Sequence, residues 1–278
     1  MNTCPTKAGI CALTNITDQY NYKLYSMTDI QIIHSEIIEL FKKYKISWET
    51  NKIPIELLQE WSYGAAELLD LDREHIRKRF SEIYWALFSV QLSLGYALIS
   101  RQTCKYLRGL KGEAFSPNNI PLISVSEFHL FYHLNNSWES IYRCWERLSS
   151  LLCSIIFPNE TNKLYFDKTV NLIGSSEDLQ SLLKYNDLKK QIKFWNKAAR
   201  ERNKISHRES SPMKIMQTKT DTAHIYGPNN EYIPKVTFTF SNLLNDINNV
   251  RDNYYRIVPA ILIVKEYCES YIKHKTKL

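Results

Sequence analysis

The feature that most constrains the fold of this chain is an uncharged stretch of eighteen residues, from Ile83 to Ser100. A helix of that length extends for roughly 27 Å, which suits the core of a helical protein or, at the lower limit, a membrane span. The stretch contains Gln91 and other polar residues, and three basic residues, 77–79, precede it closely. We therefore predict a buried central helix, with a membrane span as the alternative.

Apolar residues recur every three or four positions along most of the 278-residue chain, which predicts helices. One helix should begin at Thr28, which can form a capping box with Gln31. A second should begin at Pro54, because proline is favoured at the first helical position. A third should run from Asp72 to about Arg108 through the uncharged stretch and end at Gly109.

Start signals also precede three later apolar runs: Ser124 with Glu127, Ser175 with Asp178, and Ser241. The first of these helices should end near Phe157, before Pro158, and Pro259 should kink or divide the last one. Between them, residues 213–218 and 236–240 favour strands and flank a turn cluster. We predict a small β-hairpin or an ordered loop there.

These elements indicate an all-α fold with one helical domain over residues 26–278 and an N-terminal tail or arm over residues 1–25. The start of the chain lacks the pattern of a signal peptide, so we expect a cytoplasmic protein. The six cysteines are scattered, which favours structural thiols over a disulfide framework or a zinc site. No metal or other cofactor is expected.

The net charge of +7 is concentrated in one segment. Eight basic residues and one acidic residue, Glu201, lie between Lys189 and Arg208, so twenty residues carry a charge excess equal to that of the whole chain. Such a stripe is either a solvated helix face or an attractive surface for polyanions, above all phosphate backbones. The predicted RNA-binding residues are Lys189, Lys193, Lys197, Arg200, Lys204 and Arg208.

On an ideal helix the lysines lie opposite an apolar arc, but Arg202 projects from near the middle of that arc. A charge there is costly unless it is paired or lies in a polar cleft. Asn203 and His207 lie one turn apart at the border of the arc, so the Asn203 amide can orient the imidazole. An arginine that binds a phosphate and a histidine that transfers protons suffice for metal-independent RNA cleavage when the 2′-hydroxyl supplies the nucleophile.

The sequence Arg-Asn-Lys-Ile-Ser-His at 202–207 resembles the Arg-x4-6-His motif of HEPN-domain proteins, often seen as Arg-Asn-x3-His. The resemblance implies an all-α bundle with a long N-terminal helical extension and its core at about 124–275. It also implies a homodimer with a composite active site and a metal-independent endoribonuclease of a toxin–antitoxin or anti-phage system. Arg202 and His207 would be the catalytic pair, Asn203 a supporting residue, and RNA and an antitoxin or sensor protein the partners. Glu209 replaces the tyrosine that the antitoxin modifies in one toxin subclass, so that control is not expected.

Simpler interpretations compete with these. Arg202 could pair with a carboxylate of a neighbouring helix, and His207 could be a cation favoured at a helix C-terminus. Glu139, Arg143 and Glu146 are most simply surface ion pairs, or else one of them orients the motif across the bundle. The chain would then be a non-catalytic RNA-binding or adaptor protein, or a scaffold that does not bind RNA.

Overall fold

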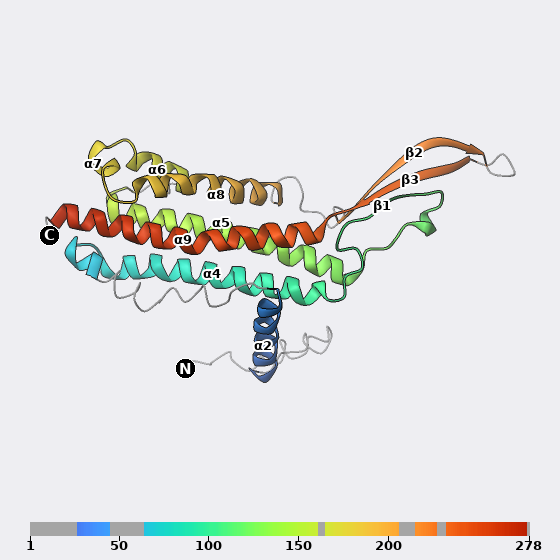
Figure 1. Cartoon of the computed structure of the whole chain (residues 1–278), viewed down its shortest axis with the longest axis horizontal. Helices are drawn as coiled ribbons and strands as arrows, with labels where there is room; N and C mark the ends of the chain where they lie inside the picture. Colours follow the sequence, from blue (N-terminus) through green and yellow to red (C-terminus); the bar gives the residue numbers. More distant parts are fainter. Residues whose placement is uncertain (1–26, 45–63, 161–164, 206–214, 227–231, 277–278) are drawn as a thin grey trace, which may run out of the picture.

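The computed structural model describes residues 27–44, 64–160, 165–205, 215–226 and 232–276. It is mostly helical and has one small sheet, in agreement with the predicted all-α class (Figure 1). The elements are α2 (Met27–Lys43), α4 (Arg73–Arg101), β1 (Lys111–Ala114), a 3-10 turn (Pro117–Asn119), α5 (Val125–Ile156), α6 (Phe166–Ile173), α7 (Glu177–Gln180), α8 (Tyr185–Asn203), β2 (Met216–Tyr226), β3 (Tyr232–Phe240) and α9 (Leu243–Thr276).

Three long helices, α4, α5 and α9, lie along one another and form the centre of the molecule, as Figure 1 shows. Helices α6 and α8 pack on α5, and α2 packs on α4. The largest buried side chains are Trp145 of α5 and Tyr254 and Tyr267 of α9. Burial of a large apolar side chain contributes about 1.5–3 kcal/mol, so these side chains of α5 and α9 stabilise the core strongly.

The uncharged stretch forms the C-terminal part of α4 and places one face in the core, including Val90, Leu94 and Leu98. Gln91 is buried in the same face, and its amide nitrogen donates a 2.9 Å hydrogen bond to the Tyr254 hydroxyl. Among the described helices, α4 is the one whose length and composition would allow it to cross a membrane, and half of that window is buried inside the protein.

The capping box predicted at Ser124 and Glu127 is confirmed, and α5 ends at Ile156, just before the residues predicted to stop it. Glu127 is fully buried, and its carboxylate also accepts hydrogen bonds from the backbone N–H groups of Lys105, at 2.5 Å, and Tyr106, at 3.0 Å. One side chain therefore fixes both the start of α5 and the connection that follows α4.

The three strands form an antiparallel sheet in the order β1-β3-β2, at one end of the bundle (Figure 1). The predicted hairpin is confirmed, although its strands are longer than expected. The prediction that the third helix extends to Arg108 was wrong, because α4 ends at Arg101 and the chain then turns into β1. Pairing with β3 and stacking of Tyr106 on Phe240, with ring centroids 4.5 Å apart, outweigh the local helical pattern.

The start of the basic helix was also predicted wrongly. Ser176, not Ser175, caps a short helix, α7, and α8 begins at Tyr185 after Lys184, whose φ of 72° breaks the helical path. The preceding segment, in which no helix was predicted, contains α6. Four buried residues on one face of α6, including Phe166 and Ile173, explain this helix, because packing on α5 stabilises a segment too short to be helical alone.

Two other helix starts differ from expectation. Asn242 replaces Ser241 as the cap of α9, since its side-chain oxygen accepts a 3.0 Å hydrogen bond from the N–H of Asn245. Helix α9 continues through Pro259 as one element instead of dividing there, and the neighbouring Ile257, Ala260 and Ile261 are buried in the core. Helix α2 begins at Met27, so Thr28 is helical rather than a cap. The predicted start at Pro54 lies outside the described residues, and the helix is seen at 64–68.

We predict that Gly95→Ala destabilises the protein by about 1–3 kcal/mol, because the contact between α2 and α4 has no room for another methyl group. A Cβ at Gly95 would lie 2.5 Å from Cγ2 of the buried Ile37, whose β-branched side chain has little freedom to move. Urea denaturation measures the free energy of unfolding. Gly64→Ala is the control, because nothing lies within 4 Å of the position that its new methyl group would take. Equal stability of the two variants would contradict the prediction.

Candidate functional site

Helix α8 presents a row of lysines on the face opposite its buried residues. Lys189 and Lys193 are exposed and Lys197 is half-buried, while Leu188 and Ala198 are in the core. None of the three lysines forms an ion pair with any described residue. Lys193 lies 4.8 Å from the centroid of the Phe194 ring. We call Lys189, Lys193 and Lys197 the lysine row. Its positive charges, four residues apart, repel one another, and a polyanion would relieve that repulsion.

The other described basic residues of the segment have acidic neighbours. Lys190 lies 3.0 Å from Asp187, and Lys204 lies 3.0 Å from Glu201. Arg200 is exposed and approaches Glu201 at 3.5 Å. The lysine row is therefore the part of the basic helix whose charge is least compensated.

Arg202 points toward α5 rather than toward the lysine row, as the helical pattern predicted. Its Nε donates to Oε2 of Glu139 at 3.3 Å, and its guanidinium lies 5.1 Å from the centroid of the Tyr142 ring. Its Nη1 donates to the side-chain oxygen of Asn203 at 3.3 Å. The Nη2 atom has no hydrogen-bond acceptor among the described residues, and the side chain is 31% exposed. Two of the three guanidinium nitrogens, Nε and Nη1, are thus held, and Nη2 remains as a donor.

Glu139 connects two arginines. Its Oε1 lies 3.5 Å from Arg143, one turn further along α5, and its Oε2 accepts from Arg202. The predicted ion pair with Arg143 is present, and Glu139 is also the residue of this group that contacts the motif from across the bundle. The carboxylate therefore orients Arg202 with a charge-assisted hydrogen bond.

The prediction that Glu146 forms a surface ion pair was wrong. Glu146 is 6% exposed and accepts a 3.1 Å hydrogen bond from the indole N–H of Trp195. Helix α8 packs on α5 through Trp195, and a buried indole N–H requires an acceptor. The sequence pattern of opposite charges at helical spacing does not reveal this role, because it contains no information about the facing helix.

Tyr142 is a residue of the site that the sequence did not indicate. Burial raises the pKa of its phenol to about 12, the nearby carboxylate of Glu146 and the Tyr165 ring act in the same direction, and Arg202 opposes them. The phenol is therefore neutral in the physiological pH range, and its hydroxyl can donate a hydrogen bond. It lies three residues after Glu139, on the same face of α5.

The C-terminal end of α8 faces the start of α9. Burial and the nearby Glu201 raise the pKa of Asp246 to about 6, and Lys204 opposes this shift. Helix α8 ends at Asn203 and continues into a π-helical turn at 204–205, so ideal helical spacing does not extend to the end of the motif. His207 and Arg208 lie outside the described residues.

Comparison of the chain with protein-family models, with curated proteins and with solved structures finds no match. Within the described ranges, no group of three or more His, Cys, Asp and Glu residues could hold a metal ion. The described cysteines, Cys104, Cys144, Cys153 and Cys268, are free thiols. Burial raises the pKa of Cys144 and Cys268, so these thiols are poor nucleophiles.

We predict that Asp246→Asn stabilises the protein by about 1–3 kcal/mol at pH 7.5 but hardly at pH 3.5. The raised pKa means that the folded protein binds this proton more tightly than the unfolded chain does. The destabilising effect is absent below the ordinary pKa of 3.8 and complete above about pH 6. Urea denaturation at both pH values measures the change. Asp252→Asn, on an exposed face of the same helix, should alter stability little at either pH. A gain that is independent of pH would contradict the assignment.

Proposed function

We propose that this chain is a metal-independent endoribonuclease with a HEPN-like bundle, acting as a homodimer in the cytoplasm in a toxin or anti-phage context. The observation that carries the proposal is the position of Arg202 on a basic helix. Its Nε is held by Glu139, its Nη2 has no acceptor among the described residues, and its guanidinium lies against the ring of Tyr142, whose phenol is neutral. This arrangement provides donors for a phosphate while keeping the guanidinium from turning into solvent.

In the proposed reaction, the 2′-oxygen of the RNA attacks the adjacent phosphorus and the bond to the 5′-oxygen breaks. His207 accepts the proton of the 2′-hydroxyl, and the 5′-oxygen gains a proton as it leaves. Arg202 stabilises the negative charge that develops on the phosphoryl oxygens. The products are a 2′,3′-cyclic phosphate and a 5′-hydroxyl, and the nucleophile belongs to the substrate. Single-stranded or loop RNA fits best, because its 2′-oxygen can align with the leaving group.

The second candidate is a non-catalytic RNA-binding or adaptor protein. The ion pair between Arg202 and Glu139 favours it, because the same contact could serve only to link α8 to α5. Both candidates bind RNA through the lysine row. They differ in whether the RNA remains intact.

We predict that the wild-type protein cleaves RNA in EDTA and leaves 2′,3′-cyclic phosphate ends, which mass spectrometry of the products detects. Arg202→Ala should lower the cleavage rate about 10²- to 10³-fold, because one set of phosphate donors is lost. His207→Ala should abolish cleavage. Arg251→Ala is the control, since Arg251 has similar exposure and also pairs with a carboxylate, Asp252.

Normal cleavage by a correctly folded His207→Ala variant would refute the catalytic assignment. If the wild-type protein binds RNA and leaves it intact, the adaptor function replaces the ribonuclease.

We also predict that replacing Lys189, Lys193 and Lys197 together with glutamine weakens RNA binding and its dependence on salt. The plot of log Kd against log salt concentration should become less steep by about 2, because each contacted phosphate of a single strand contributes about 0.7. Fluorescence anisotropy with a labelled single-stranded RNA measures this slope. The control carries the same charge change at lysines that pair with carboxylates: Lys42, Lys190 and Lys265. An unchanged slope in the first variant would show that the lysine row does not contact RNA.

A further inference from the structure

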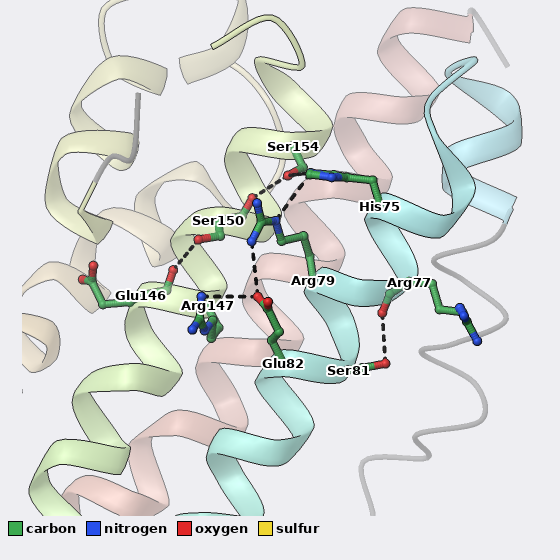
Figure 2. A network of polar contacts seen from close by, with 9 residues as sticks. All are labelled: His75, Arg77, Arg79, Ser81, Glu82, Glu146, Arg147, Ser150 and Ser154. Carbon is green, nitrogen blue, oxygen red and sulfur yellow. Dashed lines mark hydrogen bonds and ion pairs between the residues drawn. The ribbon is translucent and has the colours of Figure 1, made fainter. Parts of the chain in front are cut away.

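A pocket of about 700 Å³ opens between the first turns of α4 and the last turns of α5. This volume lies in the range of small-molecule sites. Figure 2 shows His75 and Arg79 of α4 and Arg147, Ser150 and Ser154 of α5 converging at its wall. The pocket shares no lining residue with the Arg202 site, and Arg147 is eight residues beyond Glu139 on α5, or roughly 12 Å along the helix.

The two arginines of this pocket share one carboxylate. Nη1 of Arg79 and Nη1 of Arg147 each lie 3.3 Å from the same oxygen of Glu82 (Figure 2). Both distances exceed the 2.7–2.9 Å typical of strong charge-assisted hydrogen bonds, and one carboxylate neutralises one guanidinium of the two. Both side chains remain about one third exposed. The pair therefore keeps donors and an excess positive charge for an anion that can reach both guanidiniums.

Besides its ion pair with Glu82, Arg79 contacts the imidazole of His75, and a ligand can replace this second contact. Nε2 of His75 lies 3.1 Å from Oγ of Ser154 and 3.4 Å from Nε of Arg79. The Ser154 hydroxyl donates to the carbonyl of Ser150, so its oxygen is left to accept from His75. A protonated Nε2 cannot also accept from Arg79. One of the two contacts to the imidazole is therefore weak, and Nε of Arg79 is available to a better acceptor.

The pocket is acidic where α4 begins and α5 has ended, with the exposed residues Asp70, Asp72 and Glu160, here called the acidic rim, in its lining. Oδ1 of Asp72 caps α4 by accepting from two backbone N–H groups, whereas Oδ2 makes no such contact. This rim would repel a ligand that is anionic throughout. A pocket with arginines along its two helices and carboxylates at the helix ends suits a ligand with an anionic group at one end and N–H donors at the other.

The lining also includes apolar residues. Leu71 and Phe157 are half-buried, and their side chains can contact a flat ring. The combination of an arginine pair, an apolar wall and an acidic rim matches the three parts of one class of molecule, in which a phosphate, a sugar and a base with amino groups follow one another.

We propose that this pocket binds a nucleoside monophosphate, with its phosphate between Arg79 and Arg147 and an amino-bearing base against the rim of Asp70, Asp72 and Glu160. Guanine fits the rim best, because its two adjacent N–H donors match the two oxygens of a carboxylate. The site does not depend on the ribonuclease activity, and the binding measurement below does not involve cleavage.

Isothermal titration calorimetry of the full chain with GMP tests the proposal, with UMP, guanosine and inorganic phosphate as partial probes. GMP should bind at least tenfold more tightly than each of the others. Arg79→Gln and Arg147→Gln should each weaken GMP binding at least tenfold. Arg143→Gln, one turn earlier on α5 and outside the pocket, should leave it unchanged. Ser154→Leu should block GMP by filling the pocket while both arginines remain, which guards against misfolding of the arginine variants.

Absence of heat with GMP, or binding that persists in both arginine variants and in Ser154→Leu, would overturn the proposal. Equal affinity for GMP and UMP would show that the acidic rim does not recognise the base. An oligoribonucleotide with a 5′-phosphate distinguishes a free nucleotide from an RNA end. If it binds more tightly than GMP and loses this advantage in Arg147→Gln, the phosphate subsite stands and its natural ligand is an RNA terminus.

Discussion

Helix α5 contacts α4, α6, α8 and α9. These contacts determine the positions of the Arg202 site and of the pocket that contains Arg79 and Arg147. A helix that is surrounded on most sides needs apolar residues around most of its circumference, and sixteen residues of α5 are buried. The polar side chains that it carries must therefore find partners on the facing helices. Glu139 and Glu146 do so on α8, and Arg147 does so on α4. The charged side chains of both proposed sites therefore lie where α5 contacts α8 and α4.

The hydrogen bond between Trp195 and Glu146 has a particular role in this arrangement. A buried hydrogen bond to a charged group contributes about 1.5–3 kcal/mol. It fixes the rotation of α8 about its own axis. Arg202 lies seven residues, or two helical turns, after Trp195, so the same rotation brings it to Glu139 and Tyr142 and turns the lysine row outward.

The parts of the fold that local pattern determines were predictable from the sequence. The capping box at Ser124, the apolar period of α5 and the inward direction of Arg202 each depend on spacing within one element. The parts that were missed depend on distant segments. β1 is a strand because β3 pairs with it, and Glu146 is buried because Trp195 faces it. Tyr142 was missed for the same reason, since nothing in its own helix indicates an arginine above its ring.

The order of the strands affects how the chain can fold during its synthesis. β1 follows α4, but its partner β3 precedes the last helix, so nearly the whole polypeptide must leave the ribosome before the sheet can close. Pairing between segments so far apart is slow, because a long loop has to be ordered first. The contact of α4 with α5 needs a much shorter loop. The helical hairpin of α4 and α5 should therefore form first, and the sheet and the contacts of α9 should form later.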